Sequence, residues 1–155
     1  MTEQTLGNEN QPVAILGQFV KDLSFENPDP IAFLAIQDAQ PEINMDVNIN
    51  ANGLNDGHFE VVLKVKLTAK HQEKTIFLSE LAYSTIAKID EEAIGKENMG
   101  PILMVHIPHL AFPFVRAILY NVIRDGGLPP FAIHPIDFAG MYEQNAKNQE
   151  NPTIN

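Results

Sequence analysis

The sequence predicts an α+β domain in which one four-stranded antiparallel sheet comes first and helices follow. Between residues 19 and 89, apolar and polar residues alternate in several segments, and this period of two is typical of half-buried strands. Later in the chain, helical spacing separates Phe112, Val115, Ile118, Leu119, Val122 and Ile123. The 155 residues are enough for one domain with a hydrophobic core.

The first strand is predicted around residues 19–26, before the prolines Pro28 and Pro30, which cannot donate to a sheet. Its apolar residues Leu23 and Phe25 are expected on the buried face. The polar residues between them, Asp22, Ser24 and Glu26, are expected to face water and form an acidic ridge. Residues 31–42 are predicted to form a loop with apolar side chains.

Three more strands are predicted at 43–50, 59–68 and about 75–89. The second alternates strictly, with Ile43, Met45, Val47 and Ile49 inward. The third buries its odd-numbered residues from Phe59 to Leu67. In the fourth, Phe77, Leu81 and Tyr83 are expected on one face, and Leu78 and Glu80 on the other. Turn residues at Asn52-Gly53 and Asp56-Gly57 favour hairpin connections.

A long helix is predicted from about Phe112, with Pro113 in its first turn and Gly126-Gly127 as its stop signal. Residues 128–131 predict an extended, proline-bearing connector. Asp137 is expected to cap a short helix that runs through Tyr142. The predicted domain spans residues 12–143, and the polar ends, 1–11 and 144–155, are predicted to be disordered tails.

The charge of the chain is −10 and is unevenly distributed. The first 60 residues hold ten acids and a single base, Lys21, whereas the remaining residues are close to neutral. Such a field repels phosphate backbones and anionic lipids, which argues against nucleic-acid and membrane-surface binding. It favours a cationic protein partner, and the alternative is that the acidity only aids solubility.

Several classes of site and location are disfavoured. The absence of cysteine excludes disulfides, thiolate catalysis and cysteine-ligated zinc. The first residues lack the features of a signal peptide, and no uninterrupted run of 18 apolar residues occurs, so a cytoplasmic protein is expected. No nucleotide-binding or hydrolase motif is found. His106 and His109 lack an obvious third metal ligand, and Glu91-Glu92 is interpreted as a solvated charge run. The prediction is a protein that is not an enzyme and needs no cofactor or metal.

Six blocks of sequence together resemble the SecB family of bacterial protein-export chaperones. They occur in family order over roughly residues 19–142: Lys21–Glu26 with Pro28, Phe59–Val65, Thr75–Glu80, Phe112–Arg116, Gly127–Phe131 and Pro135–Phe138. The resemblance implies a four-stranded antiparallel sheet with a long and a short helix, and a homotetramer built as a dimer of dimers. The long helices would pack between dimers, and residues 102–123 are apolar around much of their circumference. The implied interface residues are Phe112, Val115, Ile118, Leu119 and Val122.

The resemblance further implies a chaperone that holds unfolded secretory precursors and delivers them to the motor ATPase SecA. The implied client groove comprises Ile31, Phe33, Leu34, Ile36, Phe77, Tyr83, Leu128 and Phe131. The alternative for Phe77 and Tyr83 is a place in the core. Family members often carry an aromatic residue where this chain has Ala39, which indicates a shallower or differently formed groove.

The implied docking site for SecA comprises Asp22, Ser24, Glu26, Leu78 and Glu80. Its partner would be the small, basic, zinc-carrying C-terminal segment of SecA, so that any zinc belongs to the partner. Two other hypotheses stay open at this point. One is an acidic oligomeric adaptor of the same fold without unfolded clients, such as a relative in toxin–antitoxin control, and the other is a small hydrolase with an unrecognised site.

Overall fold

The structure is a computed structural model that describes residues 11–36, 40–129 and 131–150. The elements of the sheet are β1 (Val13–Glu26), β2 (Glu42–Gly53), β3 (His58–His71) and β4 (Lys74–Ile89), with the short helix α1 (Pro30–Ala35) between β1 and β2. Then follow α2 (Glu91–Ile94), α3 (Lys96–Pro101), the π-helical turn η1 (Ile102–His106), α4 (Ile107–Asp125) and α5 (Phe138–Glu150). The predicted α+β class is confirmed.

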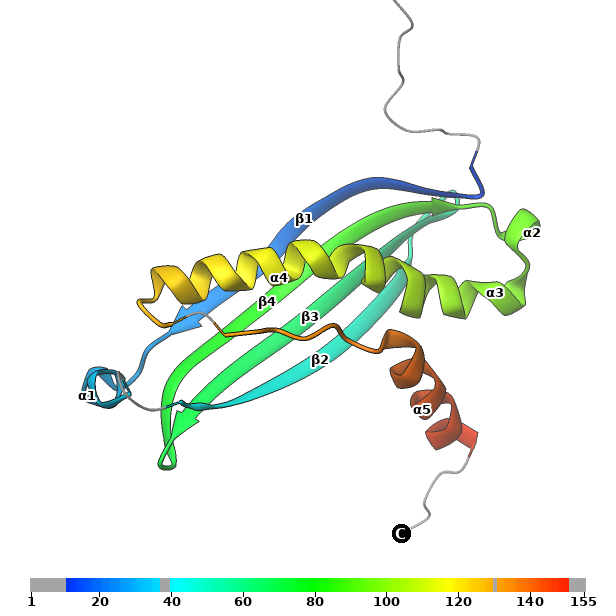
Figure 1. Cartoon of the computed structure of the whole chain (residues 1–155). Coiled ribbons are helices and arrows are strands. Elements are labelled where there is room, and N and C mark those ends of the chain that lie inside the picture. Colours follow the sequence, from blue (N-terminus) through cyan, green and yellow to red (C-terminus); the bar gives the residue numbers. More distant parts are fainter. Residues whose placement is uncertain (1–10, 37–39, 130, 151–155) are drawn as a thin grey trace, which may run out of the picture.

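The four strands form one antiparallel sheet in the order β1-β4-β3-β2, with β1 and β2 at its edges. Helix α4 and the connector after it lie across one face of this sheet, and α5 projects beyond the β2 edge (Figure 1). We call the face under α4 the helix side and the opposite face the open face. The main core lies on the helix side, where α4 residues such as Val115 and Leu119 pack on Leu63 and Val65 of β3.

The predicted alternation along β3 and β4 is confirmed. Odd-numbered residues of both strands lie on the helix side, including Val61, Leu67, Phe77 and Leu81, each at most 2% exposed. Even-numbered residues from His58 to Thr68 and from Leu78 to Lys88 face the other way, whereas Ile76, at a register shift in β4, is buried in the main core. All four strands extend beyond the predicted bounds, and β1 begins at Val13 and not near residue 19.

Two register shifts in β1 change which residues share a face. One lies between Ile15 and Gly17, and the other between Val20 and Asp22, so Lys21 is an extra residue opposite β4. The Lys21 ammonium reaches Glu60 of β3 at 2.8 Å, and the hydroxyl of Ser84 on β4 donates to the same carboxylate oxygen at 2.8 Å. The bulge therefore places Lys21 next to Asp22 on the open face, tied across two neighbouring strands.

Helical residues continue without a break from Lys96 to Asp125, through the π-helical turn η1. By length and composition alone this helix could cross a membrane, although it contains no uninterrupted run of 18 apolar residues. A helix packed on a sheet passes the same test, and this one lies along the sheet (Figure 1). Only 33% of its most apolar window is buried within the chain, so its outer side is left for another partner.

The predicted stop at Gly126-Gly127 is confirmed by its hydrogen bonds. The Leu128 N–H donates to the Ile123 carbonyl at 3.2 Å, and the Gly127 N–H donates to the Arg124 carbonyl at 3.0 Å. Gly127 has φ +81°, the left-handed conformation that favours glycine. This pair of bonds is a Schellman motif, which ends α4 and turns the chain back over the sheet.

Two predictions of irregular structure were wrong. The expected loop after β1 contains α1, because the Asp29 carboxylate accepts the N–H groups of Ile31 at 3.1 Å and Ala32 at 2.9 Å, and Pro30 occupies the first helical position. Helix α5 does not end at Tyr142 but continues to Glu150, so residues 144–150 are helical and not a disordered tail. The Asp137 carboxylate accepts the Gly140 N–H at 2.9 Å, as its predicted capping role requires. Residues 1–10 and 151–155 lie outside the described residues.

Candidate binding surfaces

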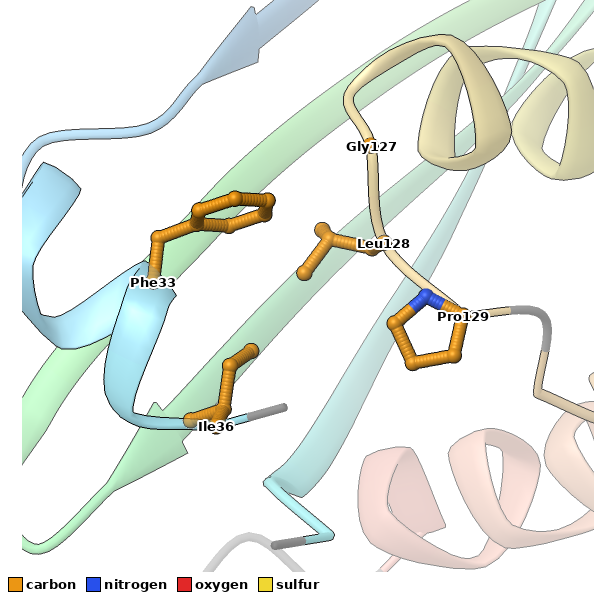
Figure 2. A pocket seen from close by; sticks show the side chains of 5 residues that line it. All are labelled: Phe33, Ile36, Gly127, Leu128 and Pro129. Atoms are coloured by element: carbon orange, nitrogen blue, oxygen red, sulfur yellow. The ribbon is translucent and has the colours of Figure 1, made fainter. Parts of the chain in front are cut away.

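A small apolar hollow lies between α1 and the chain that leaves α4. We call it the connector groove; its volume is about 290 Å³, and its lining residues are Phe33, Ile36, Gly127, Leu128 and Pro129. The side chains of Phe33 and Leu128 point toward one another across it, with Ile36 and Pro129 along its other side (Figure 2). Three of the predicted groove residues, Phe33, Ile36 and Leu128, thus come together from segments about 90 positions apart in the sequence.

Glycines allow the two segments of the groove to approach closely. A Cβ atom at Gly127 would lie 3.2 Å from the ring of Phe33, and one at Gly126 would collide with the ring of Phe25. The α4 stop signal is therefore also a packing requirement. Without these glycines the end of α4 could not lie this close to β1 and α1.

Helix α1 presents its apolar residues in two directions. Ala32 and Ile36 are buried against the core, whereas Ile31 and Leu34 are 71% and 62% exposed. Isoleucine and leucine on the outside of a six-residue helix contribute nothing to the core of this chain. They extend the apolar surface near the connector groove, and both were predicted as groove residues.

Phe77 and Phe131 belong to a stack of aromatic rings beside the groove. The ring of Phe77 lies between Phe25, at 5.7 Å, and Phe131, at 6.2 Å between centroids. Phe77 is 1% exposed, so it is a core residue that supports this region from below, in line with the alternative weighed from the sequence.

Tyr83 does not belong to the connector groove. It lies six residues from Phe77 along β4, is 7% exposed, and stacks under α4 on Phe114 at 6.4 Å between centroids. Burial raises the pKa of its hydroxyl. The sequence placed Tyr83 on the correct face of β4, but the length of the strand separates it from α1.

The five predicted docking residues lie on one face of neighbouring strands. The register pairs Ser24 with Glu80, and Glu26 with Leu78, and it places Asp22 one pair further along β1. These side chains share the open face because the bulge at Lys21 comes before all three β1 residues. Leu78 is half-buried and the other four are exposed, so the structure assembles an acidic surface with one apolar side chain.

The open face also contains a hollow that the sequence did not single out. Its volume is about 450 Å³, and it is lined by side chains from all four strands, among them Asp22, Asp46, Lys64, Lys66 and Glu80. The Lys66 ammonium lies 3.6 Å from the Glu80 carboxylate. The alternation of Lys64 and Lys66 with the apolar residues Leu63, Val65 and Leu67 was the available signal for these cations, but only the register shows that Lys66 adjoins Glu80.

The predicted interface residues on α4 fall into two groups. Phe112, Val115 and Leu119 are at most 5% exposed and pack in the chain's own core, which leaves little of their surface for contact with another subunit. Ile118 and Val122 are half-buried at the side of the helix. The exposed part of α4, which we call its outer side, carries Leu110 and Phe114, which are 54% and 52% exposed and which the sequence analysis missed. Phe114 lies at the edge of this side, where its ring stacks on Tyr83. The four-residue spacing of Leu110 and Phe114 was the signal for a second apolar stripe.

Strand β1 is an edge strand with an apolar outer part. Ile15, Leu16, Phe19, Val20 and Leu23 are between 37% and 51% exposed. A long edge strand with apolar side chains is a ready template for pairing with another chain.

No group of three or more metal-binding side chains is found within the described ranges 11–36, 40–129 and 131–150.

Comparison with known proteins shows one consistent relationship. Residues 7–149 match the family model of SecB, described as preprotein translocase subunit SecB. Protein-export protein SecB of Nitrobacter hamburgensis is 41% identical over 143 residues, which cover 92% of this chain and 89% of that protein. The protein of the same name from Rhodopseudomonas palustris is 41% identical over 153 residues, covering 94% of this chain and 96% of the relative.

A solved structure shares the fold at low sequence identity. It is a SecB-like chaperone of Mycobacterium tuberculosis, in complex with a ChAD peptide from the HigA1 antitoxin. The TM-score is 0.61 at 13% identity, over 81% of this chain and 91% of that chain. This likeness supports the four-stranded sheet with its helices, and at such identity it speaks to the fold alone.

Proposed function

Because the chain belongs to the SecB family, whose members are protein-export chaperones and not enzymes, we propose that it binds unfolded secretory precursors in the cytoplasm and delivers them to SecA. The observation that carries the client-binding part is the apolar surface formed by the connector groove together with the exposed Ile31 and Leu34 of α1. Apolar surface without charged side chains fits the exposed hydrophobic segments of an unfolded chain.

The mechanism we propose is mass action. A protein that binds the unfolded state and not the native state shifts the folding equilibrium of its clients toward the unfolded state. The shift grows with the ratio of the chaperone concentration to its dissociation constant for the unfolded client. Selectivity then depends on how fast a client folds, and not on its exact sequence. The groove meets this requirement because its walls are Phe, Ile, Leu and Pro side chains, which impose little hydrogen-bond specificity.

Refolding of a slow-folding precursor tests client binding. The precursor is diluted from denaturant into the purified protein, and recovery of its native fluorescence is followed. We expect arrested refolding, which is released by an excess of a second unfolded protein. Unimpeded refolding at concentrations well above those of the client would contradict the proposal.

For docking to SecA we propose the open-face residues Asp22, Ser24, Glu26, Leu78 and Glu80. Their support is the shared face on β1 and β4, the acidic character, and the excess of ten acids over one base in the first 60 residues. Opposite charge across an interface speeds association and selects the partner. Glu80→Lys is expected to weaken SecA binding about tenfold or more at low salt, and Glu92→Lys in α2 makes the same charge change away from this surface.

Isothermal titration with SecA, or with its basic zinc-carrying C-terminal segment, measures this difference. Equal affinity of wild type and a well-folded Glu80→Lys variant at low salt would overturn the docking assignment. Urea unfolding and light scattering of both variants control for changes in fold and assembly.

The dimer of dimers is also a proposal, with a revised set of contacts. The outer side of α4 offers Leu110 and Phe114, with the half-buried Ile118 at the side of the helix, and the β1 edge offers a second apolar surface. Two such surfaces per chain are what a tetramer with two kinds of interface requires. A charge at the side of this helix, as in Ile118→Asp, is expected to produce smaller species by light scattering, and a persistent tetramer would contradict the packing.

The alternative is an adaptor of the same fold that has no unfolded clients. The relatives with 41% identity over most of the chain carry the name of export proteins, whereas the chaperone complexed with an antitoxin peptide shares only 13% identity. This difference favours export. The refolding experiment separates the two, since an adaptor would leave the precursor free to fold.

A further inference from the structure

The charges on the open face alternate across the sheet. The register aligns Ser24 of β1, Glu80 of β4, Lys66 of β3 and Asp46 of β2 in one row. Lys64, two residues before Lys66 on the same face, also lines the hollow. The surface proposed for a basic partner therefore has cations of its own on β3, between the acids of β1 and β4 on one side and Asp46 of β2 on the other.

Lys66 forms an ion pair with one of the predicted docking residues. Its ammonium lies 3.6 Å from Glu80, and the two side chains are 46% and 51% exposed. An ion pair this exposed is weak, so it does little for stability and can be exchanged for another partner. Glu80 is also the charged docking residue on β4, where it is paired with Ser24 of β1 on one side and with Lys66 of β3 on the other.

We propose that Lys66 is a built-in competitor at the docking surface, which occupies Glu80 and limits how tightly a basic partner binds. This inference rests on the proposed docking to SecA. A partner cation that approaches Glu80 must displace the Lys66 ammonium or share the carboxylate with it. It also meets a like charge within a Debye length, which is about 10 Å at 0.1 M salt.

A competitor of this kind serves delivery. A chaperone that hands over clients and departs needs a partner affinity that is sufficient for encounter but not for a permanent complex. A lysine in the acidic surface lowers affinity while the overall acidic field, and so the rate of encounter, is largely kept. Lys66 is thus an affinity-setting residue, and the docking contacts themselves belong to the acidic residues and Leu78.

Removal of Lys66 tests the inference directly. Lys66→Thr keeps a residue suited to a strand and is expected to strengthen binding of the basic SecA segment roughly three- to tenfold at 50 mM salt. The gain is expected to disappear at 0.5 M salt, since exposed charges are then screened. Lys66→Arg keeps a cation beside Glu80, and its affinity for the SecA segment should equal that of wild type.

Lys88→Thr is the matched control, because it makes the same charge change on an exposed residue of β4 near the other end of the strand. It is expected to change the affinity less than twofold. Urea midpoints and light scattering establish that each variant keeps its fold and assembly. If Lys66→Thr fails this check, Lys66→Gln replaces it.

A second background shows whether Lys66 acts through Glu80. In Glu80→Gln protein, Lys66→Thr should lose most of its gain, because the carboxylate for which the two cations compete is gone. Suppose that Glu80→Lys weakens binding of the SecA segment but Lys66→Thr leaves it unchanged or weakens it. That result would overturn the role of Lys66 and leave the docking surface standing. Absence of binding by wild type and Lys66→Thr alike would overturn both.

Discussion

The two faces of the sheet are made from the same strands and differ in almost every property. On the helix side, Leu63, Val65 and Leu81 are 1% exposed and pack under α4. On the open face, Lys64, Lys66 and Glu80 are exposed neighbours of those residues in the sequence. At these positions a step of one residue along β3 or β4 passes from the core to a charged surface. The comparison teaches that stability and recognition can be changed almost independently in this chain.

The connector groove shows a third situation, between these two extremes. Its residues are apolar like the helix side, yet they line an open hollow at the end of the sheet, where α1 meets the chain leaving α4 (Figure 2). Apolar surface that the chain does not cover itself is available for other chains. Single substitutions on each of these surfaces are expected to affect different properties of the protein.

Leu119→Ala probes the helix side. Leu119 is fully buried in the core between α4 and the sheet, so truncation leaves a cavity and should lower the free energy of unfolding by about 2–5 kcal/mol. Urea unfolding at fixed protein concentration measures the change. Leu54→Ala, at a turn residue that is 50% exposed, should cost less than about 1 kcal/mol. Similar losses for both would refute the division between core and surface.

Phe114→Asp probes the outer side of the same helix. Because Phe114 is 52% exposed in the single chain, an aspartate can be solvated there, and the chain should still fold. In an assembly that forms through this side the carboxylate would be buried. The dissociation constant of the assembly should then rise by roughly a hundredfold or more, equivalent to about 3 kcal/mol. Sedimentation velocity over a range of concentrations measures it. An unchanged assembly would move the interface away from α4.

Leu34→Ser probes the apolar surface near the groove. Leu34 is 62% exposed, so its loss should leave the unfolding free energy nearly unchanged, while client binding weakens about fivefold to tenfold through lost apolar contact. The concentration that half-arrests precursor refolding gives the readout, and Leu54→Ser is the matched control. Equal potency of the two variants would indicate that α1 does not touch clients.

Lys21→Met probes the ion pair on the open face and should have the smallest effect. The hydrogen bond from Lys21, assisted by that from Ser84, lowers the pKa of Glu60 from its ordinary value of 4.5. Because the pKa of Glu60 is lowered in the folded state, its ionised carboxylate stabilises the fold at pH values above the ordinary pKa. This contribution is lost as the pH falls through the pKa of the folded state. The free energy of unfolding of wild type should therefore exceed that of Lys21→Met by at most about 1 kcal/mol at pH 7, and by less at pH 3.5.

Urea midpoints at the two pH values measure this difference, with Lys88→Met as a control for the loss of one positive charge. A gap between wild type and Lys21→Met that stays constant from pH 7 to 3.5 would show that Glu60 is not the partner that matters.

Much of this molecule follows from local pattern in the sequence. Alternation placed Asp22, Ser24, Glu26, Leu78 and Glu80 on one face, because strand geometry points successive side chains in opposite directions regardless of what surrounds them. The Asp137 cap and the Gly126-Gly127 stop were likewise predictable, since hydrogen bonding and backbone conformation at helix ends are local. The family resemblance then implied a docking role for Asp22, Ser24, Glu26, Leu78 and Glu80 that their chemistry alone did not.

Other features were decided only by the tertiary structure. Helix α4 has apolar residues on both sides, and which side meets the sheet depends on the packing of Phe112, Val115 and Leu119 against distant strands. The proximity of Phe33 to Leu128, and of Lys66 to Glu80, depends on the register and on where the connector returns. Period and composition describe each segment by itself, whereas contacts between segments arise from minimising exposed apolar area over the whole chain.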